Sequence, residues 1–356
     1  MARGTIEFKD RISDAMSRMG SSALKNFAME IVLLLLVGVL IAFAPGFASL
    51  GNFFNVLRTV SMLGIVAFGM TAVIIAGEID LSVGAGAGLA GCIVAWFAGK
   101  LTHPVGAVGA VVIGAVVALS VGFLTGVFTG KMREHYNVPT FITTLGLYTA
   151  LRGAANLVTG GFPMPTFPEW FYFFGAGDLF GVPFPVYVFL AVFVVMHFLM
   201  EYTTFGRHTY AVGGNAEAAR LFGIDVAWTK TRALAVTGAL AAVSGILFAS
   251  QVGSAIGTMA TGMELDVISA TIIGGTSLQG GKGRIWGTLL GVLFLGCIAN
   301  GMTLLNVSEY WQYVVRGGII LGAVLFNQIP ERDPKKRHDV TKRGVKDASV
   351  AAEERF

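Results

Sequence analysis

Residues 53–76 have the sequence FFNVLRTVSMLGIVAFGMTAVIIA, in which Arg58 is the one charged side chain. A helix that spans a bilayer needs about 20 consecutive apolar residues, and this stretch is long enough. Further apolar runs, separated by polar residues or by Pro and Gly, follow the same pattern along the chain. The predicted spans are 28–44, 53–76, 82–99, 105–129, 139–159, 183–201, 231–250, 263–275, 285–305 and 310–327. We therefore predict an all-α fold, a polytopic transmembrane bundle of about ten spans.

The composition agrees with a membrane protein and excludes an ordinary soluble domain. Hydrophobic residues make up 54% of the 356 residues and charged residues 13%, whereas soluble domains carry about 25% charged residues. One membrane domain is expected at 28–327, between a cytoplasmic segment at 1–27 and a basic, disordered tail at 328–356. The run at 263–275 is short for a full span and is expected to be a half-helix or a re-entrant segment. Cys92 and Cys297 lie in apolar runs and are expected to be buried, unpaired thiols.

The basic residues predict the orientation, because short cytoplasmic loops carry an excess of Lys and Arg. If the chain has ten spans and a cytoplasmic N-terminus, most basic residues lie on the cytoplasmic side, including Lys131, Arg133, Arg207, Arg220, Lys282 and Arg284. Both termini are therefore predicted to be cytoplasmic. The largest external loop, 160–183, is rich in Pro and aromatic residues. It is interpreted either as an interfacial aromatic belt or as a docking surface for an external protein.

The longest internal cytoplasmic loop, 206–226, has the sequence GRHTYAVGGNAEAARLFGIDV. Ala and Arg favour a short helix, Asn215 or Glu217 can cap its start, and Gly223 can end it. The alternative is an ordinary solvated surface helix.

Four stretches carry a family resemblance: GEIDLSVGAGAGLAG at 77–91, NVPTFITTLGLYTALRG at 137–153, the 206–226 loop, and IIGGTSLQGGKGRIWGTLLG at 272–291. Together they resemble the ribose/xylose/galactose class of ABC permeases over residues 52–327. The resemblance implies ten-helix subunits that form a homodimer or pseudo-dimer in the bacterial inner membrane. It also implies a periplasmic sugar-binding protein and a cytoplasmic two-cassette ATPase that binds ATP and Mg. The solute would be a pentose, hexose or polyol.

The same resemblance assigns a role to the 206–226 loop. In ABC importer permeases the EAA-x-x-x-G core contacts the ATPase, and Glu217 and Gly223 match its ends. The expected coupling residues are Asn215, Glu217, Ala218, Ala219, Arg220 and Gly223. This chain is expected to bind no cofactor and no nucleic acid.

Acidic residues occur in two similar motifs. The family usually has Gly-Gly-Ile-Asp-Leu-Ser where this chain has Gly77-Glu78-Ile79-Asp80-Leu81-Ser82, so Glu78 is an extra carboxylate. Asp80 is interpreted either as the cap of a helix that begins at Leu81 or as a marker of the transport pathway. The pair Glu264 and Asp266 repeats the spacing of Glu78 and Asp80 and suggests an internal duplication.

Other features limit the alternatives. The glycine-rich segment 274–283 fails the phosphate-loop spacing, so ATP hydrolysis is assigned to a partner, and this segment is predicted to be a flexible cytoplasmic turn. Thr143, Thr144, Asn156 and Asn300 either line a solute path or form hydrogen bonds between helices. The sequence has no metal-ligand spacing and no catalytic constellation, so a transport subunit is expected and not an enzyme. The remaining rivals are a branched-chain amino-acid ABC permease and an ion-coupled transporter whose ion site would require Glu78, Asp80, Glu264 or Asp266.

Overall fold

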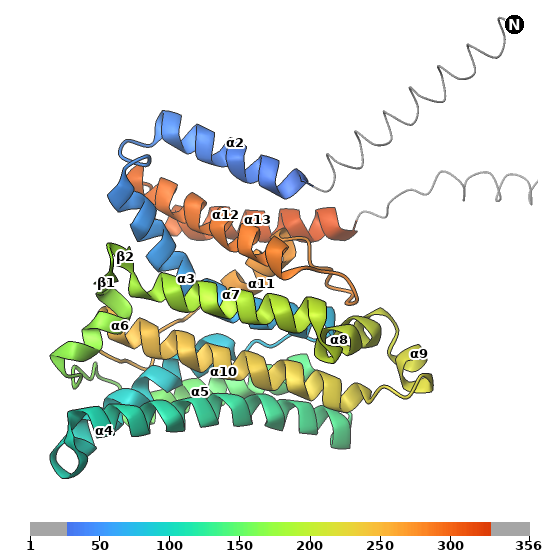
Figure 1. Cartoon of the computed structure of the whole chain (residues 1–356), viewed down its shortest axis with the longest axis horizontal. Coiled ribbons are helices and arrows are strands. Elements are labelled where there is room, and N and C mark those ends of the chain that lie inside the picture. The colour runs from blue at the N-terminus through green and yellow to red at the C-terminus, as the bar shows by residue number, and fades with distance from the viewer. Residues whose placement is uncertain (1–26, 329–356) are drawn as a thin grey trace, which may run out of the picture.

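The structure is a computed structural model that describes residues 27–328, and this part of the chain is mostly helical (Figure 1). Its elements are α2 (Ala28–Phe43), α3 (Leu50–Ile75), α4 (Val83–Tyr136), α5 (Thr140–Thr159), the 3-10 helix η1 (Glu169–Tyr172), α6 (Phe173–Ala176), β1 (Asp178–Leu179), β2 (Val182–Pro183), α7 (Phe184–Tyr202), α8 (Thr204–Gly214), α9 (Ala216–Leu221), α10 (Val226–Val252), α11 (Met263–Ile273), α12 (Ile285–Leu304) and α13 (Glu309–Gln328). The predicted terminal segments, 1–27 and 328–356, lie outside the described residues except for one residue each.

Five helices in the described range are long and apolar enough to cross a membrane: α3, α4, α7, α10 and α12. The other predicted spans are shorter or more polar; α2 has 16 residues and α11 has 11. The helical class of the fold is therefore confirmed.

Helix α4 contains two of the predicted spans, joined by a sharp bend. Pro104 lies at the bend, and Gly106 has a φ of 76° and a ψ of 157°, which are not helical values. The chain reverses there, and the two halves of α4 pack against each other. A Cβ atom on Gly114 would lie 3.0 Å from the Cα atom of Val94. Figure 1 shows this reversal as the loop at one end of α4. The second half continues to Tyr136, seven residues beyond the predicted end at 129.

The core is centred on α3. Ile65, Phe68 and Met70 are fully buried, and the helix packs against α7, α10, α11 and α12. From Val60 onward, most apolar side chains of α3 are therefore removed from both water and lipid. A second cluster of buried side chains lies between α4, α5 and α10. Cys92 and Cys297 are free and buried, which confirms the prediction for both thiols.

Close contact between α4 and α10 depends on glycine. A Cβ atom on Gly126 would overlap the carbonyl of Leu234 and would lie 2.6 Å from the Cα atom of Ala235. Gly122 and Gly238 approach each other in the same way. Small residues thus let two backbones pack directly, as expected for helices in a membrane.

The two ends of the bundle are distinct. At one end, Gly281 N donates to Ile75 O at 2.8 Å, and the Tyr210 hydroxyl donates to Gly283 O at 2.9 Å. The predicted flexible turn at 274–283 is therefore held against α3 and α8. At the other end, Arg58 pairs with Asp178 at 2.7 Å, which attaches the 160–183 segment to α3. Figure 1 places α8 and α9 opposite β1 and β2.

Helix α10 starts earlier than predicted for a local reason, whereas α11 is the short helix that was predicted. Helix α10 begins at Val226, five residues before the predicted start at 231, because the side chain of Asp225 caps it by accepting a hydrogen bond of 2.8 Å from Trp228 N. Helix α11 ends at Ile273 and is half the usual length of a span. It is largely buried by protein, as expected of a half-helix at membrane depth.

Candidate coupling segment and transport site

The predicted coupling residues form a short exposed helix, α9, with a defined start and end. Asn215 is extended, and its side chain accepts a hydrogen bond of 3.0 Å from Ala218 N. Gly223 has a φ of +81°, a left-handed conformation that favours glycine. Ile224 N then donates to Ala219 O at 3.0 Å, which closes the turn. The short helix therefore ends before Gly223, as predicted, and Asp225 caps the next helix, α10.

The surface of α9 combines charge with large apolar side chains. Glu217 and Arg220 form an ion pair of 3.2 Å, and both side chains are mostly exposed. Leu221 and Phe222 are 88% and 86% exposed at the end of the helix. Exposed apolar side chains of this size, next to charges, are typical of a protein contact. Sequence reasoning missed Leu221 and Phe222, although both lie inside the motif that it selected.

A neighbouring tyrosine joins the coupling segment to the bundle. Burial and, to a smaller extent, nearby Glu201 raise the pKa of Tyr210 to about 12, although Arg284 acts in the opposite direction. The phenol therefore keeps its proton at neutral pH and can donate to Gly283 O, the bond that holds the glycine-rich segment. Movement of α8 would thus reach the segment that precedes α12.

Glu78 lies at the junction of three elements. Its carboxylate oxygen Oε1 is 2.6 Å from Lys230 Nζ on α10 and 2.6 Å from Arg133 Nε on α4. Glu78 is 7% exposed. Lys230 lies five residues after Asp225, so the ion pair is close to the point where the coupling segment enters the bundle. The Glu78 carboxylate therefore ties α4 and α10 to the segment between α3 and α4.

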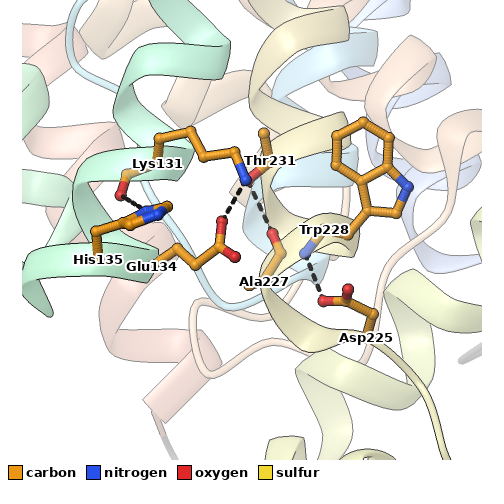
Figure 2. Close-up of polar contacts among 7 residues, drawn as sticks. All are labelled: Lys131, Glu134, His135, Asp225, Ala227, Trp228 and Thr231. Atoms are coloured by element: carbon orange, nitrogen blue, oxygen red, sulfur yellow. Dashed lines mark hydrogen bonds and ion pairs between the residues drawn. The ribbon is translucent and has the colours of Figure 1, made fainter.

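Figure 2 shows the adjoining ends of α4 and α10. Lys131 and Glu134 form an ion pair of 2.7 Å on α4, and Asp225 caps α10 beside them. Gly130 lies against Thr231, where a Cβ atom would overlap the threonine side chain. The two helix ends are thus packed together at the base of the coupling segment.

Asp80 does not cap a helix at Leu81. Helix α4 begins at Val83, and the Asp80 carboxylate accepts hydrogen bonds from Ser82 N at 2.8 Å and from Ser82 Oγ at 2.6 Å. The side chain forms a local turn ahead of the helix, since its hydrogen-bond partners are two residues away. Gly77 allows this turn with a φ of +78°. Burial raises the pKa of Asp80, and the two bonds from Ser82 lower it.

The second acidic pair lies on α11. Glu264 is buried against Gly84, at the start of α4. Asp266 forms an ion pair of 2.7 Å with Arg316 of α13. In each motif one carboxylate pairs with a distant cation, but the residue differs: it is Glu78 in the first motif and Asp266 in the second.

The predicted solute-path residues lie mostly in hydrogen bonds within or between helices. Asn300 exchanges two hydrogen bonds with Asn52, at 2.8 and 2.9 Å. Asn156 donates to Arg152 O at 2.9 Å, and Thr144 donates to Phe141 O at 3.2 Å. Thr143 Oγ1 is buried without a hydrogen-bond partner in the described chain. None of these four lines the cavity described next.

A cavity of about 470 Å³ lies between α3, α10, α11, α12, α13 and the segment 258–263. Its walls are mainly apolar, and its polar lining residues are Thr59, Thr258, Thr261, Asp266, Gln312 and Arg316. Of these, the sequence prediction included only Asp266. The sequence could have indicated Arg316, because it is a charged residue within the predicted apolar span 310–327, and such residues usually have a function.

Comparison with known proteins identifies relatives of this chain. Residues 52–324 match the family model described as branched-chain amino acid transport system / permease component. The ribose import permease protein RbsC of Escherichia coli is 42% identical over 299 residues, which cover 83% of this chain and 91% of that relative. The probable ABC transporter permease protein YphD of the same organism is 38% identical, covering 92% and 96%. The L-arabinose transport system permease protein AraH is 36% identical, covering 86% and 92%. No solved structure matches the chain.

Proposed function

This chain belongs to the family described as branched-chain amino acid transport system / permease component, and from that premise we propose that it is the permease subunit of an ABC importer for a sugar or sugar-like solute. The family description would also fit the branched-chain amino-acid alternative. Identity of 42% and 36% with permeases named for ribose and L-arabinose, over most of each chain, favours the sugar class. The solute is a pentose, hexose or polyol.

The observation that carries this proposal is the α9 segment. It presents an ion pair, Leu221 and Phe222 on an exposed helix whose ends are defined by Asn215 and Gly223. An ATPase that binds ATP and Mg can press on this surface, and the Glu78 ion pair transmits the movement to α4 and α10. ATP hydrolysis is assigned to that partner subunit.

We infer ten membrane crossings with both termini in the cytoplasm of an inner membrane. The ten segments are α2, α3, the two halves of α4, α5, α7, α10, α11, α12 and α13. In this arrangement α8, α9 and the 274–283 segment share the cytoplasmic end with most of the basic residues, as the positive-inside rule requires. The 160–183 segment is then periplasmic and available to a solute-binding protein. A second permease copy completes the pathway.

Two of the four candidate carboxylates, Glu78 and Asp266, offer little to an ion-coupled transporter. Glu78 contacts two cationic side chains and Asp266 contacts one, so bound cations would compete with these partners. Within residues 27–328 there is also no group of three or more His, Cys, Asp or Glu that could hold a metal ion.

Uptake by proteoliposomes tests the proposal. The chain is reconstituted with its ATPase, with ATP inside and with the cognate binding protein and radiolabelled D-ribose, L-arabinose, D-xylose or leucine outside. We expect uptake of a sugar that requires ATP and survives ionophores that collapse sodium and proton gradients. ADP in place of ATP is the control and should give no uptake. Uptake driven by an ion gradient without ATP, or of leucine alone, would refute the proposal.

A further inference from the structure

The cavity next to Asp266 lies in one half of the bundle. Thr59 follows Arg58, which binds Asp178 in the 160–183 segment at 2.7 Å. Lining residues also come from the last turns of α10, the second half of α12 and the first half of α13. Under the proposed topology these are the periplasmic halves of their helices. A solute released by a binding protein would reach this cavity early in its passage.

The size of the cavity suits a small molecule. Its volume of about 470 Å³ falls within the range of about 300–1,000 Å³ that is usual for ligand pockets. Most of the wall is apolar, with Met62, Phe248 and Met259 among the lining residues. Such side chains can pack against the C–H faces of a sugar ring. A few polar groups in a mainly apolar wall are the usual arrangement for orienting a ligand.

The charges in the cavity favour a neutral solute. Asp266 Oδ2 accepts a hydrogen bond of 2.7 Å from Arg316 Nη1, so the carboxylate and the guanidinium compensate each other. A free cation would compete with Arg316, and a free anion would compete with Asp266. A neutral molecule with several hydroxyl groups can instead donate and accept hydrogen bonds without breaking the pair.

One acceptor in this pair is unused by the protein. Asp266 Oδ1 is buried and has no hydrogen-bond partner in the part of the chain that the structure describes. An unpaired buried carboxylate oxygen is unfavourable, which implies a partner supplied from elsewhere. Asp266 lines the cavity together with Gln312 and Thr59, so a hydroxyl group of a solute in the cavity can donate to its carboxylate.

From these observations we propose that the cavity is a transit site for a neutral polyhydroxylated solute, and that Asp266 accepts a hydrogen bond from one of its hydroxyl groups. The inference rests on the proposed import function. It assigns solute contact to α11 and α13, instead of to Thr143, Thr144, Asn156 and Asn300. The periplasmic binding protein would still select the solute, and this site would discriminate among the solutes delivered.

The test compares Asp266→Asn with Glu309→Gln in the full transporter. The control alters a carboxylate of α13 that accepts a hydrogen bond of 3.0 Å from the Tyr313 hydroxyl and does not line the cavity. Sugar uptake per ATP hydrolysed is measured for the transported sugar and for its monodeoxy analogues. We expect Asp266→Asn to lower uptake per ATP about tenfold, as expected from weakening a hydrogen bond to a charged group. It should also remove the discrimination against one deoxy analogue that the wild type shows.

A second pair of variants tests the volume of the cavity without touching its charges. Ala299→Phe fills space in the cavity, whereas Ala239→Phe alters a half-buried alanine on α10 that does not line it. Only Ala299→Phe should slow hexose uptake more than pentose uptake. If the wild type transports sugar but Asp266→Asn keeps its uptake per ATP and its selectivity, the transit site is refuted while the import function stands. If no sugar is transported with ATP, both are refuted.

Discussion

Glu78 is a buried carboxylate between α3 and α4, and its two ion pairs explain why a charge is tolerated there. A lone buried carboxylate is costly, but Lys230 and Arg133 both lie 2.6 Å from the same oxygen. Both partners are far from Glu78 in the sequence. This charge therefore belongs to a contact between elements and not to a helix cap.

Replacing Glu78 should destabilise the protein. Removing one partner of a buried ion pair costs about 3–5 kcal/mol, and Glu78→Gln should approach the lower end because Arg133 is 34% exposed. The expected result is a lower melting temperature of the purified chain in detergent, followed by intrinsic fluorescence. Glu134→Gln is the control, since its pair with Lys131 is exposed and worth about 0–1 kcal/mol. Equal melting temperatures for the two variants would contradict a stabilising role.

Helix α9 is an element whose shape depends on single residues at its two ends. Asn215 caps the start and Gly223 reverses the chain after Leu221, so that the apolar side chains of Leu221 and Phe222 remain exposed. The helix has only six residues and would be unstable in isolation. Its conformation is therefore maintained by its caps and by the packing of Ala219.

Gly223→Val should weaken the contact between the permease and its ATPase without preventing membrane insertion. Valine reaches a φ near +81° at a cost of about 1–2 kcal/mol, so the turn after α9 should shift. Binding-protein-stimulated ATPase activity and uptake should fall together by roughly 5- to 30-fold at unchanged expression, the factor that this free energy represents. Gly214→Val is the matched control, because a Cβ atom there meets nothing within 4 Å. Wild-type activity in Gly223→Val would show that α9 is only a surface helix.

The whole molecule has two chemically different ends, and this difference underlies its proposed orientation. One end carries α8, α9 and the glycine-rich segment held by Tyr210. The other carries the aromatic 160–183 segment, with the exposed side chain of Phe180. A transporter requires such asymmetry, since solute delivery and ATP hydrolysis occur on opposite sides of the membrane.

Cysteine labelling of intact spheroplasts tests this orientation. Phe180→Cys should react with a membrane-impermeant maleimide added outside, whereas Leu221→Cys should react only after the membrane is opened. Both wild-type side chains are strongly exposed, so access to the reagent should depend on the side of the membrane. The native Cys92 and Cys297 are buried and should give a low background in the unmodified control. Labelling of Leu221→Cys from outside would overturn the proposed topology.

The amino-acid sequence by itself determined the helical membrane class, most helix positions, the short α11 and the caps of α9. These features depend on local patterns: a run of apolar residues, a capping Asn or Asp, or a Gly at a turn. The sequence did not give correct boundaries for α4 and α10. The cap at Asp225 lets α10 begin before its apolar run. Helix α4 continues to Tyr136, past the end of its apolar run.

Only the tertiary structure decided which polar side chains meet. Glu78 and Lys230 are brought together by the packing of α10 against α4 and α3, and Asp266 and Arg316 by the packing of α11 against α13. The cavity likewise needs walls from five helices and one connecting segment. The physical reason is that hydropathy in a short window predicts burial of a span, whereas contacts between spans depend on backbone approach and side-chain shape across the whole bundle.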